Sequence, residues 1–342
     1  MKFKVLLFFC VVWFSAFSQV GGETIFNFLN VPTSARQAAL GGKVLTLYDD
    51  VDQPTWNPST VNQELDNKVS VNYVNFLADI NYGSVNFAHF FSKRFGTLHG
   101  GITFVDYGEF IAADEEGNET GTFKSRDIAA TIGYARNLPW SNFYAGANFK
   151  VITSTIDTYT SSGIAFDAAL LYYNYKKPYT FTAVIRNVGY QINAFDETKE
   201  KLPLVIEIGA SYKLSEIPLK WYLTVDNLQQ WDVSVENPSD AVSSIGGDSS
   251  NEKITFLNNA IRHFVIGAEF FPDKKVNLRL GYNFRRAREL RLTETRTFAG
   301  FTAGFGLRLR RNLKFNYAFT KYHPASDTST FSLQIDLPSR IR

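Results

Sequence analysis

The amino-acid sequence predicts an all-β protein: a transmembrane antiparallel β-barrel of about 14 strands, preceded by a short N-terminal plug or helix segment. Three observations predict it. Apolar and polar residues alternate with a period of two, many alternating segments are long, and the gaps between them alternate between short and long. The composition agrees, because 45% of the 342 residues are hydrophobic, 15% are aromatic and only 20% are charged, unlike a disordered or fibrous chain.

The first 18 residues have the features of a secretory signal peptide. Lys2 and Lys4 precede an apolar run, and Ala16 and Ser18 provide the small side chains of a cleavage site before Gln19. The run is shorter than the roughly 20 residues that a membrane-spanning helix needs. We therefore predict a signal peptide over 1–18. Its removal takes away the only cysteine, Cys10, so that no disulfide, thiol nucleophile or thiolate metal site is expected.

Residues 19–66 differ in character from the rest and are predicted to form a plug-like segment ahead of a barrel over 67–342. Ser34 to Gln37 is a candidate capping box, and Gly41-Gly42 would end the short helix that it begins. Such a helix fits inside a barrel lumen. Packing against the outside of the barrel is the alternative.

The strand predictions rest on alternation. Phe315, Tyr317 and Phe319 are separated by polar or small residues, and a strand places the two sets on opposite faces. Many segments run longer than the five or six residues usual in soluble sheets, which suits a tilted membrane span. The predicted strands are 68–76, 82–90, 97–107, 126–135, 142–153, 163–173, 180–188, 204–214, 218–227, 262–270, 276–284, 298–309, 313–320 and 331–337.

The gaps between these strands favour a membrane barrel over a soluble sandwich, which also alternates. Long gaps such as 108–125, 154–162 and 228–261 alternate with short ones. The same alternation occurs in outer-membrane barrels, which have short periplasmic turns and long external loops. The predicted location is the cell outer membrane, with the protein integral to it. An even strand number then places both termini in the periplasm and the long loops outside the cell.

The polar faces of the strands carry isolated charges that would line the lumen and could pair with plug residues such as Arg36. Hydrogen-bonded packing that keeps the barrel shut and an open transport pathway are both compatible with such charges. The plug and lumen candidates are Ser34, Arg36, Asn57, Pro58, Glu207, Asp226, Arg279 and Arg308.

No pattern in the chain points to catalysis. The four histidines lack metal-ligand spacing and there is no G-x-S-x-G motif. The net charge of +2 does not indicate nucleic-acid binding. The sequence thus predicts no enzyme activity, no cofactor, no metal and no nucleic-acid partner.

Two long loops hold candidate partner-docking residues. The loop 228–261 offers aromatic and aliphatic anchors, and the next long loop offers arginines suited to phosphate or carboxylate groups. A solvated charge cluster is the alternative for the arginines. The docking candidates are Trp231, Ile254, Phe256, Arg285, Arg286 and Arg288.

Several segments carry a resemblance to a known family. The run 28–42, followed by Asp49-Asp50 and Trp56-Asn57-Pro58, resembles the N-terminus of the PorV/PorQ outer-membrane proteins of the Bacteroidetes type IX secretion system, which are similar to the FadL fatty-acid transporters. Segments 73–83 and 280–286 are similar to the PorQ branch in particular. The resemblance runs through the whole mature chain.

The resemblance implies a FadL-like barrel that is a non-enzymatic component of the type IX attachment complex. It implies docking of a PorZ-like cell-surface protein beside a PorU-like sortase and a PorV-like barrel, where cargo is linked to lipopolysaccharide in the outer membrane. The tail departs from many outer-membrane barrels, because Pro338 and four further residues follow the last strand instead of a terminal aromatic residue. The alternative function is a FadL-like transporter of hydrophobic small molecules, which needs an apolar pocket continuous with an opening.

Overall fold

The computed structural model describes residues 24–77, 80–92, 94–139, 141–233, 255–290, 298–323 and 326–338. Within these ranges, fourteen strands form a closed barrel in which every neighbouring pair is antiparallel and β1 closes on β14. This confirms the predicted fold class. The predicted signal peptide, 1–18, lies outside the described residues.

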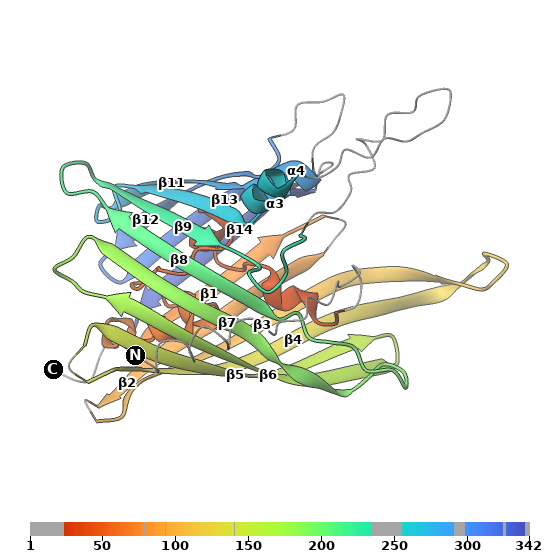
Figure 1. Cartoon of the computed structure of the whole chain (residues 1–342). Coiled ribbons are helices and arrows are strands. Elements are labelled where there is room, and N and C mark those ends of the chain that lie inside the picture. The colour runs from red at the N-terminus through yellow and green to blue at the C-terminus, as the bar shows by residue number, and fades with distance from the viewer. Residues whose placement is uncertain are drawn as a thin grey trace, which may run out of the picture.

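The strands follow the chain order around the barrel (Figure 1). They are β1 (Lys68–Asn75), β2 (Asn81–Ser92), β3 (Gly96–Ala113), β4 (Glu119–Asn137), β5 (Phe143–Ile156), β6 (Tyr159–Tyr173), β7 (Tyr179–Asn193), β8 (Val205–Lys213), β9 (Leu219–Val225), β10 (Phe264–Phe270), β11 (Val276–Asn283), β12 (Phe301–Arg310), β13 (Leu313–His323) and β14 (Ser326–Asp336).

The alternation in the sequence produces a wall that is apolar outside and polar inside. On β4, Ile128 and Ile132 are 50% and 62% exposed, whereas Thr131 between them is 4% exposed. Soluble proteins show the opposite distribution, and a lipid-facing apolar surface around a polar interior is what a membrane barrel requires. No helix in the described ranges is long and apolar enough to cross a membrane.

The loop lengths differ from the prediction at the end of the barrel opposite the short turns. The predicted loop 108–125 is largely strand, because β3 and β4 continue as a hairpin beyond the barrel, with Phe110 paired to Phe123 (Figure 1). The predicted loop 154–162 is also wrong: β5 and β6 are joined by two residues, and Asp157 adopts φ 53° there. Residues such as Asp157 tolerate this left-handed conformation and close tight hairpins.

The N-terminal segment lies inside the barrel (Figure 1). Its helix α2 (Ala35–Ala39) packs against β11 to β14, and the 3₁₀ turn η3 (Pro58–Thr60) packs against β4 to β6. The segment also contains the 3₁₀ turns η1 (Asn27–Asn30), η2 (Gln53–Thr55) and η4 (Gln63–Leu65). We call residues 24–66 the plug. The alternative of a helix packed outside the barrel is therefore wrong.

The helix α2 begins at the expected residue but does not use the predicted capping box. Ser34 is the N-cap residue, yet its side chain makes no capping bond. The barrel wall supplies the acceptor instead, because the Ala35 backbone N–H donates to the Ser332 hydroxyl at 2.8 Å. Gly41 and Gly42 end the helix with φ of 96° and 89°, as expected for a helix terminated by glycine.

Two short helices lie at the end of the barrel away from the short turns (Figure 1). Helix α3 (Phe256–Arg262) begins at Thr255, whose hydroxyl accepts from the Asn258 N–H, and α4 (Phe284–Glu289) begins at Asn283, whose side chain accepts from the Arg286 N–H. We call this end the loop end, and the opposite one the turn end.

Candidate functional site

Glycines on the inner wall make room for the plug. A side chain at Gly281 would overlap the backbone of Leu40 and Gly41, and one at Gly146 would overlap Pro58 and Ser59. The plug backbone therefore lies directly on the strands at these positions, a close approach that only glycine permits. Pro58, a predicted plug residue, is held by this contact.

An ionic cluster ties the plug to β10 and β11. The Arg36 guanidinium donates to both oxygens of Glu269, at 3.2 and 2.9 Å, and Glu269 also accepts from Arg279 at 2.9 Å. Tyr222 adds a hydroxyl donor at 2.8 Å. Arg36 and Glu269 are 8% and 0% exposed. A buried carboxylate between two guanidinium groups in bidentate geometry is strongly held.

The plug side of this cluster contains its own carboxylates. Arg36 also contacts Asp49 at 3.0 Å and Asp50 at 3.5 Å. Burial alone would lower the pKa of the Arg36 guanidinium, but the Asp49 and Glu269 carboxylates raise it well above its ordinary value. Arg36 is therefore a permanent cation that faces both the plug and the wall.

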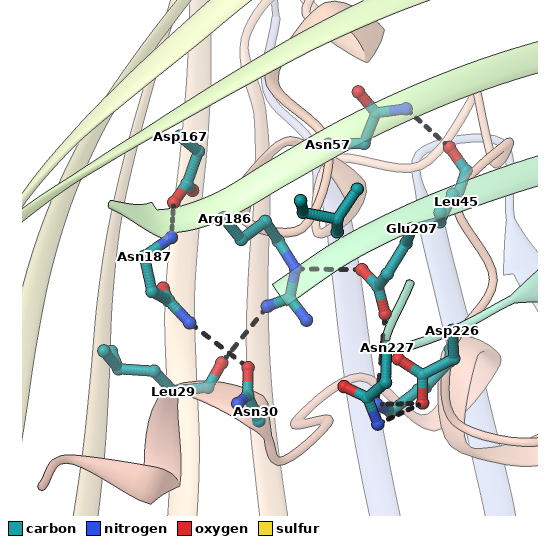
Figure 2. Close-up of polar contacts among 12 residues, drawn as sticks. Leu29, Asn30, Leu45, Asn57, Asp167, Arg186, Asn187, Glu207, Asp226 and Asn227 are labelled. Atoms are coloured by element: carbon teal, nitrogen blue, oxygen red, sulfur yellow. Dashed lines mark hydrogen bonds and ion pairs between the residues drawn. The ribbon is translucent and has the colours of Figure 1, made fainter. Parts of the chain in front are cut away.

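A second cluster joins the plug to β7, β8 and the residue that follows β9 (Figure 2). Arg186 donates to Glu207 at 3.0 Å and lies over the Trp56 ring of the plug, 4.1 Å from its centroid. The Lys43 ammonium contacts Asp226 at 2.5 Å and Glu207 at 3.9 Å. Burial lowers the pKa of Lys43, against the opposite effect of Asp226 and Glu207.

A backbone irregularity in β7 builds a third contact. Asn187 adopts φ 61°, the β6–β7 register shifts next to it, and its side chain turns inward. Its amide donates to Asn30 of the plug at 3.2 Å, while its backbone N–H donates to Asp167 at 2.9 Å (Figure 2). A bulge redirects a side chain in this way. The Lys150 ammonium forms an ion pair with the Asp167 carboxylate, with 2.7 Å between Nζ and Oδ2.

The plug also bridges the seam where β1 meets β14. Asp52 accepts hydrogen bonds from Ser70 and Asn72 on β1, and Asp50 accepts from Gln334 on β14 at 2.7 Å. Burial and then the neighbouring Asp50 raise the pKa of Asp52 to about 6, against the hydrogen bonds from Ser70 and Asn72. The plug therefore carries, at its buried contact with β1, a carboxyl group whose pKa lies closer to neutrality than usual.

A pocket of about 980 Å³ lies between the plug and the loop end of the barrel. Its lining combines plug residues, inner-wall residues and the helix α4, and many of them are apolar. Phe28 and Tyr82, 4% and 3% exposed, belong to an apolar cluster that contrasts with the polar lumen elsewhere. The apolar and aromatic residues of the lining include Phe28, Val31, Phe76, Ile80, Tyr82, Val105, Tyr107, Leu202 and Tyr322.

Three hydrogen-bond donors of this mixed lining are unpaired within the described ranges. The hydroxyls of Tyr82 and Tyr322 and one terminal nitrogen of Arg286 are buried and find no hydrogen-bond partner among the described residues. The Arg286 guanidinium stacks on the Tyr322 ring at 4.1 Å from its centroid. Buried donors without partners favour a ligand that brings acceptors, because leaving them unpaired is costly.

The other predicted residues are scattered. Arg308 is exposed at the turn end and, among the described side chains, makes no hydrogen bond or ion pair with the plug. Asn57 is fully buried, and its side-chain amide donates to the Leu45 carbonyl at 2.7 Å. Ile254 lies outside the described residues. Trp231 and Phe256 stack at the loop end, 4.7 Å between centroids.

The three predicted arginines share α4 but not one environment. Arg286 reaches the pocket, as described above. Arg285 pairs with Glu289 at 3.6 Å and also lines the pocket. Arg288 is exposed. The arginine cluster thus divides between the pocket and the outer surface.

Sequence reasoning missed Lys43, Asn187 and Tyr82. Lys43 sits just after the predicted helix, where nothing distinguishes it from a surface lysine. Asn187 is placed by a bulge that no periodicity reveals. Tyr82 occurs near a predicted strand end and resembles a membrane-interface aromatic residue. Its position in the alternation of β2, on the side that faces the lumen, could have identified it.

Neither a known family model nor a curated protein matches the sequence. Solved structures do match in fold. TbuX, a toluene transporter of Ralstonia pickettii, has a TM-score of 0.51 at 10% identity and covers 92% of this chain and 100% of its own. CymD, a monoaromatic hydrocarbon channel, has a TM-score of 0.50 at 12% identity, with 91% and 97% covered.

A deletion mutant of TodX, also a monoaromatic hydrocarbon channel, has a TM-score of 0.51 at 11% identity, with 89% of this chain and 97% of that chain covered. At such identity the likeness concerns the fold alone. The chain has the fold of a FadL-like, 14-stranded outer-membrane barrel with a short N-terminal plug.

Proposed function

We propose that the protein is a non-enzymatic outer-membrane channel for hydrophobic small molecules. The pocket between the plug and the loop end supports this function most directly. A barrel that served only as a filled scaffold has no need for a cavity of about 980 Å³ whose lining combines apolar and aromatic side chains with polar and charged ones, whereas concave sites of this kind typically bind small molecules.

The lining indicates the chemistry of the molecule. Phe28, Val31 and Val105 provide an apolar surface, and Tyr82, Tyr322 and Arg286 provide donors at one side. A largely hydrophobic molecule with one acceptor group satisfies both. The likeness to a toluene transporter and to a monoaromatic hydrocarbon channel concerns the fold and agrees with this proposal.

The pocket lining also reaches the barrel wall. It includes Val188 and Tyr190, which are 50% and 61% exposed on β7. The β7–β8 ladder ends at Arg186 paired with Val205, so β7 continues past its neighbour at this level. A molecule released from the plug would have a short path through the wall there.

A binding assay tests the proposal. Purified barrel should quench or enhance the fluorescence of N-phenyl-1-naphthylamine, and Val105→Trp, which fills the pocket, should abolish the saturable signal. Ile128→Trp is the matched control, because Ile128 faces outward at 50% exposure. Equal binding by both variants and the wild type would contradict the channel proposal.

Docking within the type IX machinery is the second candidate. The stacked Trp231 and Phe256 are 51% and 74% exposed at the loop end, and exposed aromatic residues are frequent anchors of interfaces. This role would hold a PorZ-like surface protein beside a PorU-like sortase and a PorV-like barrel. Co-purification from outer membranes tests it: Trp231→Ala with Phe256→Ala should release the partner, while Val105→Trp should retain it.

A further inference from the structure

A small pocket opens at the turn end of the barrel, on the lumen side of the wall. It has a volume of about 40 Å³, which gives room for an ion of a few atoms rather than for an acyl chain. The buried part of its lining is the ionic cluster of Arg36, Glu269 and Arg279, and Asp49 of the plug also lines it. The pocket therefore lies where the plug meets the wall.

Four further cations line this pocket without a counter-charge. They are Lys274 and Lys275 of the β10–β11 turn, Arg308 of β12 and Lys314 of β13. In the part of the chain that the structure describes, no ion pair involves any of these four side chains. The acidic residue of the turn, Asp273, is paired with Lys213 instead, at 2.7 Å.

The register of the strands sets these cations beside one another. Arg308 is the cross-strand partner of Lys314, and directly opposite residues share one face of a sheet, where like charges destabilise the pairing. On the other side of β12, the Arg308 backbone N–H donates to the Lys275 carbonyl at 2.7 Å. Three cations thus form a row across three neighbouring chain segments. An anion that binds beside them would offset their repulsion.

The carboxyl group of Asp49 responds to the positive charge of the pocket. Its side chain is 51% exposed and contacts Arg36 at 3.0 Å. Its position inside the lumen, partly shielded from water, would raise the pKa of Asp49, but Arg36, Lys220 and Lys314 lower this pKa below its ordinary value. One plug carboxylate therefore stays ionised here. It does not balance the site, because six cationic residues and only two acidic ones, Asp49 and Glu269, are among the described lining residues.

We propose that this pocket binds a multivalent oxyanion of the phosphate class. Arg308 offers a planar set of N–H donors, and the three lysines offer ammonium groups, which are the usual protein partners of phosphate. A divalent anion can balance several unpaired cations at once, whereas a monovalent anion balances one.

The position of the pocket indicates how the anion arrives. Its lining faces the lumen, so it is open to a soluble anion and not to a membrane lipid. Short turns of outer-membrane barrels face the periplasm, and the anion would enter from that side. Free phosphate and a small phosphomonoester share the required chemistry. The site is separate from the pocket at the loop end and does not rest on the proposed channel function.

Isothermal titration of the detergent-solubilised barrel tests the site, at low ionic strength because salt screens exposed charges. Inorganic phosphate should bind the wild type more tightly than acetate does. Arg308→Gln with Lys314→Gln should weaken phosphate binding on the order of tenfold, because hydrogen bonds between charged groups are stronger than neutral ones. Asp49→Asn should tighten it, because this change removes a carboxylate that competes for the same cations.

Two further arms complete the titration. Glycerol 3-phosphate distinguishes the sources: binding as tight as that of inorganic phosphate supports a phosphomonoester ligand, and weaker binding supports free phosphate. Lys274→Gln with Lys275→Gln changes only an exposed turn and should also weaken phosphate binding, so the proposal remains testable if the first pair of substitutions disturbs folding.

The β12–β13 turn provides the matched control. Arg310 and Arg311 are exposed there at the same end of the barrel, but they do not line the pocket. Arg310→Gln with Arg311→Gln removes the same amount of charge and should leave phosphate binding unchanged. Migration on gels before and after boiling checks that each variant is folded. Equal loss in the pocket pair and the control pair, equal binding of phosphate and acetate, or weaker binding by Asp49→Asn would overturn the proposal.

Discussion

The contact between Arg36 and Glu269 should hold the plug in place, and Glu269→Gln should loosen it. Arg279 and Tyr222 belong to the wall and stay beside residue 269 whether or not the plug is seated. Only the two bonds from Arg36, at 3.2 and 2.9 Å, therefore distinguish the seated from the released plug.

The structure sets the expected magnitude. Breaking a buried ion pair by removing one partner costs about 3–5 kcal/mol. Arg36 keeps Asp49 at 3.0 Å, so the lower limit applies. About 3 kcal/mol corresponds to a change of roughly a hundredfold in the population of released plug.

Thiol labelling measures that population. The only cysteine of the chain, Cys10, lies in the predicted signal peptide, so Ala38→Cys introduces a single thiol at a position that is 0% exposed. Reaction with a maleimide should be roughly a hundredfold faster when Glu269→Gln is added.

An exposed ion pair provides the control. Asp106→Asn breaks a pair with Arg126 whose side chains are 41% and 59% exposed, and such pairs contribute at most about 1 kcal/mol. It should leave labelling of the same cysteine nearly unchanged. Equal labelling in the Glu269→Gln and Asp106→Asn backgrounds would refute the argument that Arg36 and Glu269 anchor the plug.

Three further predictions concern the plug. Because the pKa of Asp52 is raised to about 6, the seated plug binds the proton more tightly than the released plug; labelling at Ala38→Cys should therefore speed up as the pH rises from 5 through 7, and Asp52→Asn should remove this dependence. Gly281→Ala should increase the same labelling, since its methyl group would overlap the Leu40 and Gly41 backbone, whereas Gly100→Ala, with open space around it, should not. Deleting residues 24–66 should raise single-channel conductance in planar bilayers while circular dichroism retains the β signal; unchanged conductance would show that the plug does not block the lumen.

The sequence predicted the wall better than its edges. A period of two shows which residues share a face of a strand, and the lipid and the lumen require opposite side-chain chemistry. The strands and the inward-facing charges, such as Glu207 and Arg279, could therefore be predicted from the sequence. The ends of the strands could not be predicted in this way, because β3 and β4 continue as a hairpin beyond the barrel, where that demand no longer applies, and β5 and β6 are also longer than predicted.

The pairing of the lumen charges was not predictable either. Phase places Asp226 in the lumen, but its partner Lys43 is 183 positions away in a segment without regular periodicity. The pocket was hidden for a related reason: its aromatic residues occur near strand ends, where membrane-interface residues are equally common. Only the three-dimensional position of the plug distinguishes the two roles.

The bridge from the plug to both β1 and β14 has a consequence for the order of assembly. The hydrogen bond from Ala35 to Ser332 joins residues 297 positions apart, and contacts so distant in sequence form late because the chain between them must first be closed into a loop. The contacts of the N-terminal segment with β14 therefore have to wait until the last strand arrives. When it does, Gln334 on that strand and Ser70 on the first meet the same short stretch of plug, at Asp50 and Asp52. Joining the two ends of the sheet and completing this part of the plug contact are consequently one event, so an assembly intermediate that lacks the final strand would also lack the bridge at Asp50 and Asp52.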